Sequence, residues 1–145
     1  MKTEIFTYLP VEARKIRETV FIIEQGFENE YDETDLVATH ILIYIDDGTP
    51  VGTCRIFWDT ELNSHILGRL AVLKEHRSKG FGAELVRAAL SLVADKGGSV
   101  LTLHAQCRSK AFYEKLGFSE FGEIEYDEGC PHIKMKKYIT KNGEV

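Results

Sequence analysis

The feature that most constrains the fold is a strand, a helix and a second strand in succession near the middle of the chain. The apolar run HILGRLAVL at 65–73 predicts the first strand, and SVLTLHA at 99–105 predicts the second. Residues 80–96 carry a wide helical apolar stripe, which suits a helix lying on a sheet, and Gly97 and Gly98 end it. Strands joined in this way run parallel with a right-handed crossover, so the sequence predicts an α/β protein.

The remaining segments extend this unit in both directions. TEIFTYL predicts an opening strand, and Pro10 suits the first turn of a helix that we expect to finish near Gly26. A hairpin of two strands, ATHILIYID and VGTCRIFWD, joins across the turn DGTP. A short helix, RSKAFYEKL, is closed by Gly117, and a hairpin of SEFGEIEY and HIKMKKY ends the chain. The predicted order is β-α-β-β-β-α-β-α-β-β, a mixed-sheet α/β fold in one domain spanning residues 1–145.

Composition excludes several classes of function. The 145 residues are 43% apolar, and the net charge of −5 argues against nucleic acid as a partner. No apolar run approaches the roughly 20 residues that cross a bilayer, and the N-terminus lacks the apolar core of a signal peptide. Three cysteines without C-x-x-C spacing argue against a disulfide framework and a metal site. We therefore expect a cytoplasmic protein with reduced, mostly buried thiols, no metal and no membrane partner.

The stretch HRSKGFG at 76–82 places two glycines and two cations where the strand gives way to the helix. A helix start exposes unpaired N–H groups and attracts phosphates. Gly80 and Gly82 permit close backbone approach, and Arg77 and Lys79 add positive charge. These residues indicate a pyrophosphate cradle; the alternative is a simple turn with solvated cations. Neither the P-loop nor the dinucleotide fingerprint is present, because Leu85 stands where the fingerprint needs its third glycine.

The context of this loop resembles a known family. LAV before the loop, R-x-x-G-x-G within it and the long helix after it resemble motif A of the GNAT-type N-acetyltransferases. AFYEKLGF at 111–118 resembles motif B, and the order of elements matches that fold along nearly the whole chain. VFIIEQGF, ATHIL, HAQ and PHIKM are similar to a small single-domain bacterial branch. The resemblance implies a GNAT fold whose central parallel strand pair splays apart.

The resemblance also implies the co-substrate, acetyl-CoA. Its pantetheine arm is expected on the backbone of 70–72 and its pyrophosphate on the loop 77–82, while Gln106 stands where relatives carry an asparagine that contacts the arm. Tyr113 is expected to contact the cofactor and to protonate the leaving thiolate; the alternative is a half-buried aromatic packed against its neighbours. The implied cofactor residues are Leu70, Ala71, Val72, Arg77, Ser78, Lys79, Gly80, Phe81, Gly82, Gln106 and Tyr113.

The residue that deprotonates the amine is less clear, because relatives place a glutamate on the strand before the loop and this chain reads LGRLAV there. Glu24, at the end of the first helix, is the first candidate for the catalytic base, and His104 and His132 follow. The same three residues are the candidates for contacting the acceptor. For each histidine, a structural hydrogen-bonded role on a strand is the alternative.

Acidic and basic residues of the sequence point to two different kinds of acceptor, and the choice between them stays open. The acidic segment FENEYDETD, with Glu28, Glu30, Asp32, Glu33 and Asp35, either attracts a cationic amine or is a solvated loop. Arg55 and Arg69 instead suggest an acceptor that carries a carboxylate.

The resulting hypothesis is an N-acetyltransferase acting on a primary amine by direct attack in a ternary complex, since no cysteine has an obvious nucleophile setting. The acceptor is a small-molecule amine or a protein or peptide amine, and the resemblance allows a homodimer. The alternative from another class is a non-catalytic sensor or regulatory module that binds acetyl-CoA.

Overall fold

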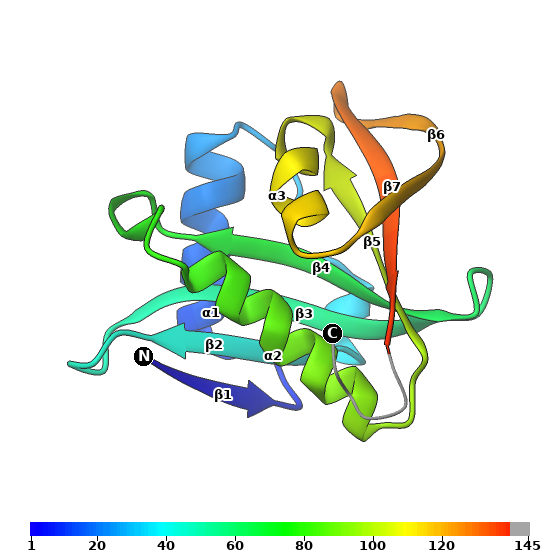
Figure 1. Cartoon of the computed structure of the whole chain (residues 1–145). Helices are drawn as coiled ribbons and strands as arrows, with labels where there is room; N and C mark the ends of the chain where they lie inside the picture. Colours follow the sequence, from blue (N-terminus) through cyan, green and yellow to red (C-terminus); the bar gives the residue numbers. More distant parts are fainter. Residues whose placement is uncertain (140–145) are drawn as a thin grey trace. The chain divides into compact units, whose positions relative to one another are not determined.

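The computed structural model describes residues 1–139, whose strands and helices follow the predicted order (Figure 1). The strands are β1 (Lys2–Phe6), β2 (Thr39–Tyr44), β3 (Pro50–Asp59), β4 (Ser64–Val72), β5 (Val100–Gln106), β6 (Ser119–Asp127) and β7 (Cys130–Tyr138). The α-helices are α1 (Val11–Arg17), α2 (Phe81–Asp95) and α3 (Lys110–Lys115). The β-α-β-β-β-α-β-α-β-β prediction is confirmed. Residues 140–145 of the predicted 1–145 domain lie outside the described residues.

The described chain divides into two compact units. The first comprises Met1–Phe57 and Gly68–Ala89, and the second comprises Trp58–Leu67 and the chain from Leu90 onward. The hydrogen-bonded strands follow one another in the order β1-β2-β3-β4-β5-β7-β6. The organisation as a single domain stays a prediction.

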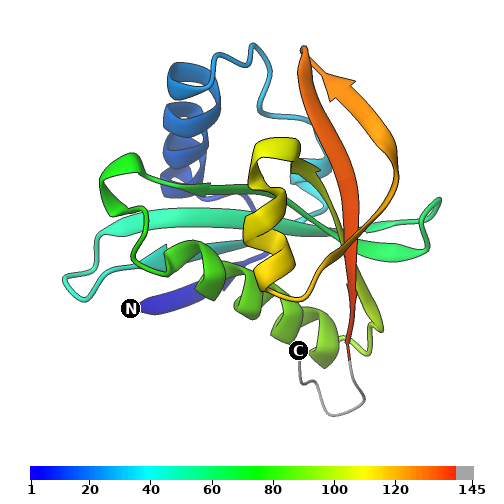
Figure 2. The same cartoon turned by 45° about the horizontal axis from the view of Figure 1, so that its top comes forward.

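The first unit is built on antiparallel strands with a helix on each face. β1 pairs antiparallel with β2, and β2 with β3. Alternate residues of β2 point to opposite faces: Leu42 packs with Ile16 and Val20 in a core cluster under α1. On the other face, the absence of a side chain at Gly52 lets Leu85 of α2 approach. Figures 1 and 2 show α1 and the first half of α2 on opposite faces of these strands.

The first helix differs from the prediction of one regular helix running to Gly26. The α-helix ends at Arg17 and continues as a π-helical segment, Glu18–Glu24. There the amide of Gln25 donates to the carbonyl of Val20, five residues back, at 3.1 Å. A wider turn moves side chains out of the 3.6-residue phase, so Val20 is buried whereas Ile23 is exposed. The predicted end is confirmed, because Gly26 adopts a left-handed φ of 80°.

The second unit is a mixed sheet with a short helix. β5 pairs antiparallel with β7, which pairs antiparallel with β6. The parallel ladder between β4 and β5 joins His65–Leu67 to Leu101–Leu103 and includes no other residue of the described chain. β4 runs on to Val72 beyond this ladder, so the predicted splayed parallel pair is confirmed.

A backbone irregularity marks the point where β4 leaves the ladder. Arg69 lies inside the strand with a φ of 50°, a left-handed conformation that L-residues seldom adopt. A left-handed residue inside a strand turns the backbone locally and re-aims its side chain. Gly68 lies against Arg55 and Phe57, and the next residue, Arg69, reaches the loop that follows the first helix. Two successive side-chain positions therefore face the same side.

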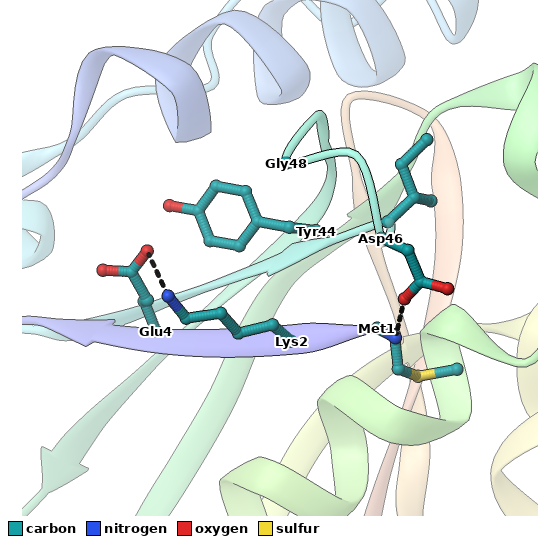
Figure 3. Close-up of a pocket in the computed structure, with 7 residues that line it drawn as sticks. Met1, Lys2, Glu4, Tyr44, Asp46 and Gly48 are labelled. Carbon is teal, nitrogen blue, oxygen red and sulfur yellow. Dashed lines mark hydrogen bonds and ion pairs between the residues drawn. The ribbon is translucent and has the colours of Figure 1, made fainter.

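A hollow of about 250 Å³ lies in the first unit, at the β1–β2 end where the chain begins (Figure 3). Within it, Lys2 and Glu4 approach to 3.8 Å, and Asp46 accepts a hydrogen bond from the amine of Met1 at 2.7 Å. Its lining shares no residue with the predicted sites. In the part of the chain that is described, no helix is both long and apolar enough to cross a membrane.

Candidate active site

The loop between β4 and α2 has the backbone shape expected of an anion cradle. After a 3₁₀ turn at Lys74–His76, Ser78 and Gly80 adopt left-handed φ values of 62° and 88°. α2 then begins at Phe81, and its first α-helical hydrogen bond runs from the Glu84 amide to the Gly80 carbonyl at 3.0 Å. Amides of a first helical turn have no acceptor within the helix, so those following Gly80 are available to an anion.

Arg77 lies at the rim of this loop and makes two kinds of contact. Its Nε donates to the carbonyl of Val72 at 2.9 Å, which ties the loop to the end of β4. Its two Nη atoms donate to the carboxylate of Glu24 at 2.5 and 2.7 Å. The hydrogen bond to Glu24 raises the pKa of Arg77. The structure thus joins the predicted base to the predicted phosphate-binding arginine.

The backbone of 70–72 belongs to the part of β4 that lies past the parallel ladder. Ala71 is buried in the core cluster under α1, while Leu70 and Val72 are half-buried. The carbonyl of Val72 accepts from Arg77, and the amide of Leu73 donates to Val51 at 2.9 Å. β4 therefore offers a strand edge next to the loop, as a strand-like ligand arm requires.

Tyr113 belongs to the second unit, on α3. Its ring packs edge-on against Phe112, with centroids 5.0 Å apart, and against Phe118 at 5.9 Å. The side chain is 9% exposed. Gly117 closes the helix at a φ of 94°, and the carbonyl of Leu116 accepts from Lys137 at 2.7 Å. The aromatic packing predicted as its alternative role is present, and the catalytic role stays a prediction.

The other predicted polar residues of the second unit lie on β5 and β7. Gln106 ends β5 and accepts from Arg108 at 2.7 Å, and in the register it stands opposite His132. A ring nitrogen of His132 lies 2.9 Å from the carbonyl of Cys130. His104 is exposed, and partial desolvation together with the charge of Lys134 lowers its pKa. At neutral pH its ring is therefore uncharged and able to accept a proton.

The acidic segment after the first helix is only partly solvated, because Glu28 and Glu33 are exposed while other acids of the segment are buried. Glu30 and Asp35 are buried, at 4% and 2% exposure, and both bind Arg17. Together they form what we call the arginine–carboxylate cluster. It consists of Arg17, Glu30, Asp32, Asp35, Arg55 and Arg69. The expectation that these acids attract a cationic amine is wrong for the two buried ones, because arginines already neutralise them.

Within the cluster, Asp32 and Asp35 are held by several donors each. Asp32 accepts from Arg55 at 2.6 and 3.1 Å and from Arg69 at 3.2 Å. Asp35 accepts from Arg17 at 2.8 Å to each oxygen and from Arg55 at 3.0 Å. A 3₁₀ turn, Glu33–Leu36, with Asp32 as its N-cap, brings the two acids together. Ion pairs therefore hold the loop in place. This explains why its sequence lacks a periodic pattern of apolar residues.

The charges in the cluster set the ionisation of its members. Burial alone would raise the pKa of Asp35, but hydrogen bonds and charge from Arg17, with a further bond from Arg55, hold it well below its usual range. The hydrogen bonds from Arg55 likewise lower the pKa of Asp32. His40, buried beside Asp35, has its pKa lowered by desolvation. Asp32 and Asp35 therefore stay ionised below the pH at which an ordinary aspartate takes up a proton.

Sequence reasoning missed Arg17, although a signal for it exists. Ala13, Ile16, Arg17 and Val20 follow the i, i+3, i+4, i+7 spacing of one helix face, so Arg17 stands on the buried stripe. A charged residue on such a stripe needs a buried partner. The conformation of Arg69 had no such signal, because left-handed geometry at an arginine within a strand is not encoded by residue type.

The cysteines and candidate metal ligands add no competing chemistry among residues 1–139. Cys54, Cys107 and Cys130 are free thiols, the first buried and the other two half-buried, so the thiols are less buried than expected. Burial raises the pKa of Cys54, which disfavours its thiolate. The described residues include no group of three His, Cys, Asp or Glu side chains arranged to hold a metal.

Comparison with known proteins extends these observations. The family described as "Acetyltransferase (GNAT) domain" matches residues 12–139. The uncharacterized N-acetyltransferase YjcF of Bacillus subtilis is 39% identical over 129 residues, which are 87% of this chain and 90% of that protein.

Two solved structures share the fold. Escherichia coli ElaA superposes with a TM-score of 0.80 at 26% identity, covering 94% of this chain and 99% of that one. An aminoglycoside 6′-N-acetyltransferase complexed with coenzyme A superposes with a TM-score of 0.75 at 17% identity, covering 95% and 97%. The match along residues 12–139, the loop geometry and the splayed strands agree. The chain belongs to the GNAT family of acetyltransferases and is an acyltransferase enzyme.

Proposed function

We propose that the enzyme transfers an acetyl group from acetyl-CoA to a primary amine by direct attack in a ternary complex. The observation that carries the proposal is the loop before α2, where left-handed Ser78 and Gly80 lead directly into the open first turn of a helix. Such a turn suits a pyrophosphate. The coenzyme A held by the aminoglycoside acetyltransferase of the same fold supports this choice of donor.

The backbone of 70–72 and the loop 77–82 are proposed to bind different parts of the donor. The pantetheine arm would pair with the β4 edge past Leu67, where the ladder to β5 has ended. Amide donors there would also polarise the thioester carbonyl as it gains negative charge. The diphosphate would take the amides of 77–82, with Arg77 and Lys79 supplying positive charge. Gln106 is proposed as an additional contact to the arm.

The chemistry then needs one base and one acid. In the proposed step, Glu24 takes a proton from the acceptor's ammonium group, and the freed lone pair attacks the thioester carbonyl carbon. The carbon–sulfur bond breaks, the leaving thiolate receives the proton of the Tyr113 hydroxyl, and the second proton of the acylated nitrogen passes to the Tyr113 phenolate and restores it. The products are an N-acetyl amide and the thiol of coenzyme A. His104 and His132 are the alternatives for the base and are proposed to contact the acceptor.

The pairing of Glu24 with Arg77 imposes an order on this scheme. A carboxylate bound at both oxygens by a guanidinium is a poor proton acceptor, because the arginine stabilises its charged form. The donor's diphosphate competes with Glu24 for the same guanidinium. We therefore propose that binding of acetyl-CoA draws Arg77 onto phosphate and releases Glu24 for catalysis.

The test combines a binding and a turnover measurement. Calorimetry with acetyl-CoA should show saturable one-site binding, and a panel of amines should include one that releases free thiol and gains the mass of an acetyl group. Saturable binding without any acetylated amine would favour the sensor alternative. No binding at all would refute the assignment of the loop.

A further inference from the structure

We propose that the amine acceptor carries a carboxylate, which Arg69 of the arginine–carboxylate cluster binds beside the β4 edge. This inference rests on the proposed acetyl transfer and names the class of acceptor: a small amino acid or a similar amino carboxylate. It decides between the two expectations that the sequence left open, a cationic acceptor drawn by acids and an anionic acceptor drawn by arginines.

Hydrogen-bond donors outnumber the available acceptors around Asp32 and Asp35 in the cluster. Every carboxylate oxygen of Asp32 and Asp35 already accepts at least one hydrogen bond. A guanidinium has five N–H donors. Arg69 uses its Nε on the carbonyl of Glu30 at 2.8 Å and its Nη2 on Asp32 at 3.2 Å, so its Nη1 has no hydrogen-bond partner among residues 1–139. The cluster therefore presents spare donors rather than spare acceptors.

The arginine side chains of the cluster differ in how far they are exposed to solvent. Arg17 and Arg55 have side chains 1% and 5% exposed, whereas that of Arg69 is 28% exposed. Partial burial lowers the pKa of Arg69 from its ordinary value but leaves the group charged at neutral pH. A partly desolvated guanidinium with free N–H groups binds a carboxylate more strongly than a fully hydrated one does. Arg69 is thus the member of the cluster that an incoming anion can reach.

An unsatisfied buried group lies against Gly68, the residue before Arg69. The Nε of Arg55 is buried and has no hydrogen-bond partner in the described chain. It faces Gly68, where a Cβ would stand 3.6 Å away, so glycine leaves room of about one methyl group above the buried N–H. Buried unpaired donors are rare and costly, and they often mark a site that a ligand completes. A buried donor without a partner thus lies under Gly68, next in sequence to Arg69.

Arg69 also lies beside the strand residues that are proposed to bind the acetyl donor. Arg69 directly precedes Leu70, the first residue of the strand edge proposed to hold the pantetheine arm. Its left-handed backbone directs the side chain toward the loop around Asp32, where two hydrogen bonds fix it. An anchor held this firmly so close to the thioester favours acceptors whose amine and carboxylate are only a few bonds apart. Amino acids have this property, whereas long polyamines and aminosugars lack the carboxylate altogether.

The experiment compares acceptors that differ only in the carboxylate. The standard amino acids and β-alanine are assayed for thiol release from acetyl-CoA, each beside its carboxamide. Amides lose the ammonium proton more easily, so amine basicity alone would favour them over the acids. We expect kcat/KM for at least one acid to exceed that of its amide about tenfold or more, the loss expected for one charged hydrogen bond. Equal rates for acids and amides would overturn the inference.

Variants assign the effect to Arg69. Arg69→Gln should lower kcat/KM for the preferred acid about tenfold, mainly through KM, and should lower kcat/KM for its amide much less. Arg69→Lys, which keeps the charge, should restore part of the loss. The matched control is Arg87→Gln, an exposed arginine on α2 paired with Glu84 at 2.7 Å, which should leave both rates unchanged. Equal loss on acid and amide in Arg69→Gln would refute the carboxylate contact.

The outcomes separate this inference from the proposed function. Acetylation of amines that lack a carboxylate, with no acid accepted, would leave acetyl transfer standing and overturn the inference. Absence of any acetylated product despite acetyl-CoA binding overturns it as well. Calorimetry of acetyl-CoA with Arg69→Gln, which should match the wild type, shows that a loss of turnover does not come from misfolding or from loss of the donor.

Discussion

Glu24 and Arg77 form a two-point ion pair, although 53 positions of sequence separate them. One ends the π-helical segment after α1, and the other follows β4. From the sequence, Glu24 was expected to deprotonate the acceptor's ammonium group, and Arg77 was expected to bind the phosphates of the donor. Their contact makes the two proposed roles mutually exclusive until a ligand separates the side chains.

The first prediction concerns this pair. Arg77→Ala should weaken acetyl-CoA binding about fivefold to tenfold, since it removes a charged hydrogen bond to phosphate. Glu24→Gln should instead tighten binding by up to about fivefold, because an exposed ion pair of roughly 0–1 kcal/mol no longer competes for Arg77. Calorimetric Kd values for both variants check this. Weaker binding in Glu24→Gln would contradict the competition.

The second prediction concerns Tyr113. Tyr113→Phe should lower kcat about a hundredfold or more, since a general acid contributes on the order of 10²–10⁴. The acetyl-CoA Kd should change little, and the melting temperature should hold, because phenylalanine keeps the edge-on contacts with Phe112 and Phe118. Thiol release under saturating amine measures the effect. An unchanged kcat would remove Tyr113 from the mechanism and leave it a packing residue.

The third prediction separates backbone shape from general stability. Gly80→Ala introduces no close contact but strains a left-handed φ of 88°, at a cost of roughly 1–2 kcal/mol. Gly48→Ala is its matched control, with a φ of 90°, no neighbour within 4 Å and a place in the β2–β3 turn. Both variants should lose similar thermal stability, whereas only Gly80→Ala should lose acetyl-CoA affinity. An equal Kd in the two variants would show that the loop shape does not matter for binding.

The fourth prediction is the pH dependence of stability. The pKa values of Asp35 and Asp32 are lower in the folded chain than the ordinary value of about 3.9, so the unfolded chain binds more protons in acid. Their contribution is complete above about pH 5 and is lost as pH falls through 4 and below. His40, with its lowered pKa, adds a loss that begins below about pH 6.5. Urea unfolding at pH 7, 5 and 3.5 should show falling free energy.

Asp35→Asn identifies the source of that dependence. The substitution leaves buried Arg17 partly unpaired and should cost roughly 3–5 kcal/mol at pH 7. It should also flatten the acid part of the profile, because the titrating group is gone. A variant that retained the full wild-type slope would show that other carboxylates carry the acid sensitivity.

Much of the fold followed from periodicity in the sequence. The strand at 65–73, the helix at 80–96 and Gly117 as a helix end are all found close to the predicted positions, because apolar spacing and left-handed glycines depend on local chemistry. The left-handed φ of Gly80 followed for the same reason, whereas the binding of a pyrophosphate by that loop stays a prediction. The π-helical turn did not, because the bonding of Gln25 five residues back depends on what surrounds the helix rather than on residue type.

The arrangement of residues near the proposed acceptor site was harder to predict, because it depends on ion pairs between residues that are far apart in the sequence. Sequence spacing identified the acids at 28–35 and the arginines at 55 and 69 but not their pairing. Asp35 lies 18 residues from Arg17 and 20 from Arg55, and only the folded chain joins them. Electrostatic interactions of this range leave no periodic trace in a single sequence.

The left-handed conformation of Arg69 also affects which side chains of β4 face the interior. Side chains alternate along a strand, and one extra residue exchanges the faces of all that follow. Gly68 and Ala71, an odd number of positions apart, therefore both lie on the α1 side. Excising a single residue there would turn Ala71 out of the interior and swing the neighbouring side chains inward. We therefore expect β4 to tolerate substitutions at these positions better than the insertion or deletion of a single residue.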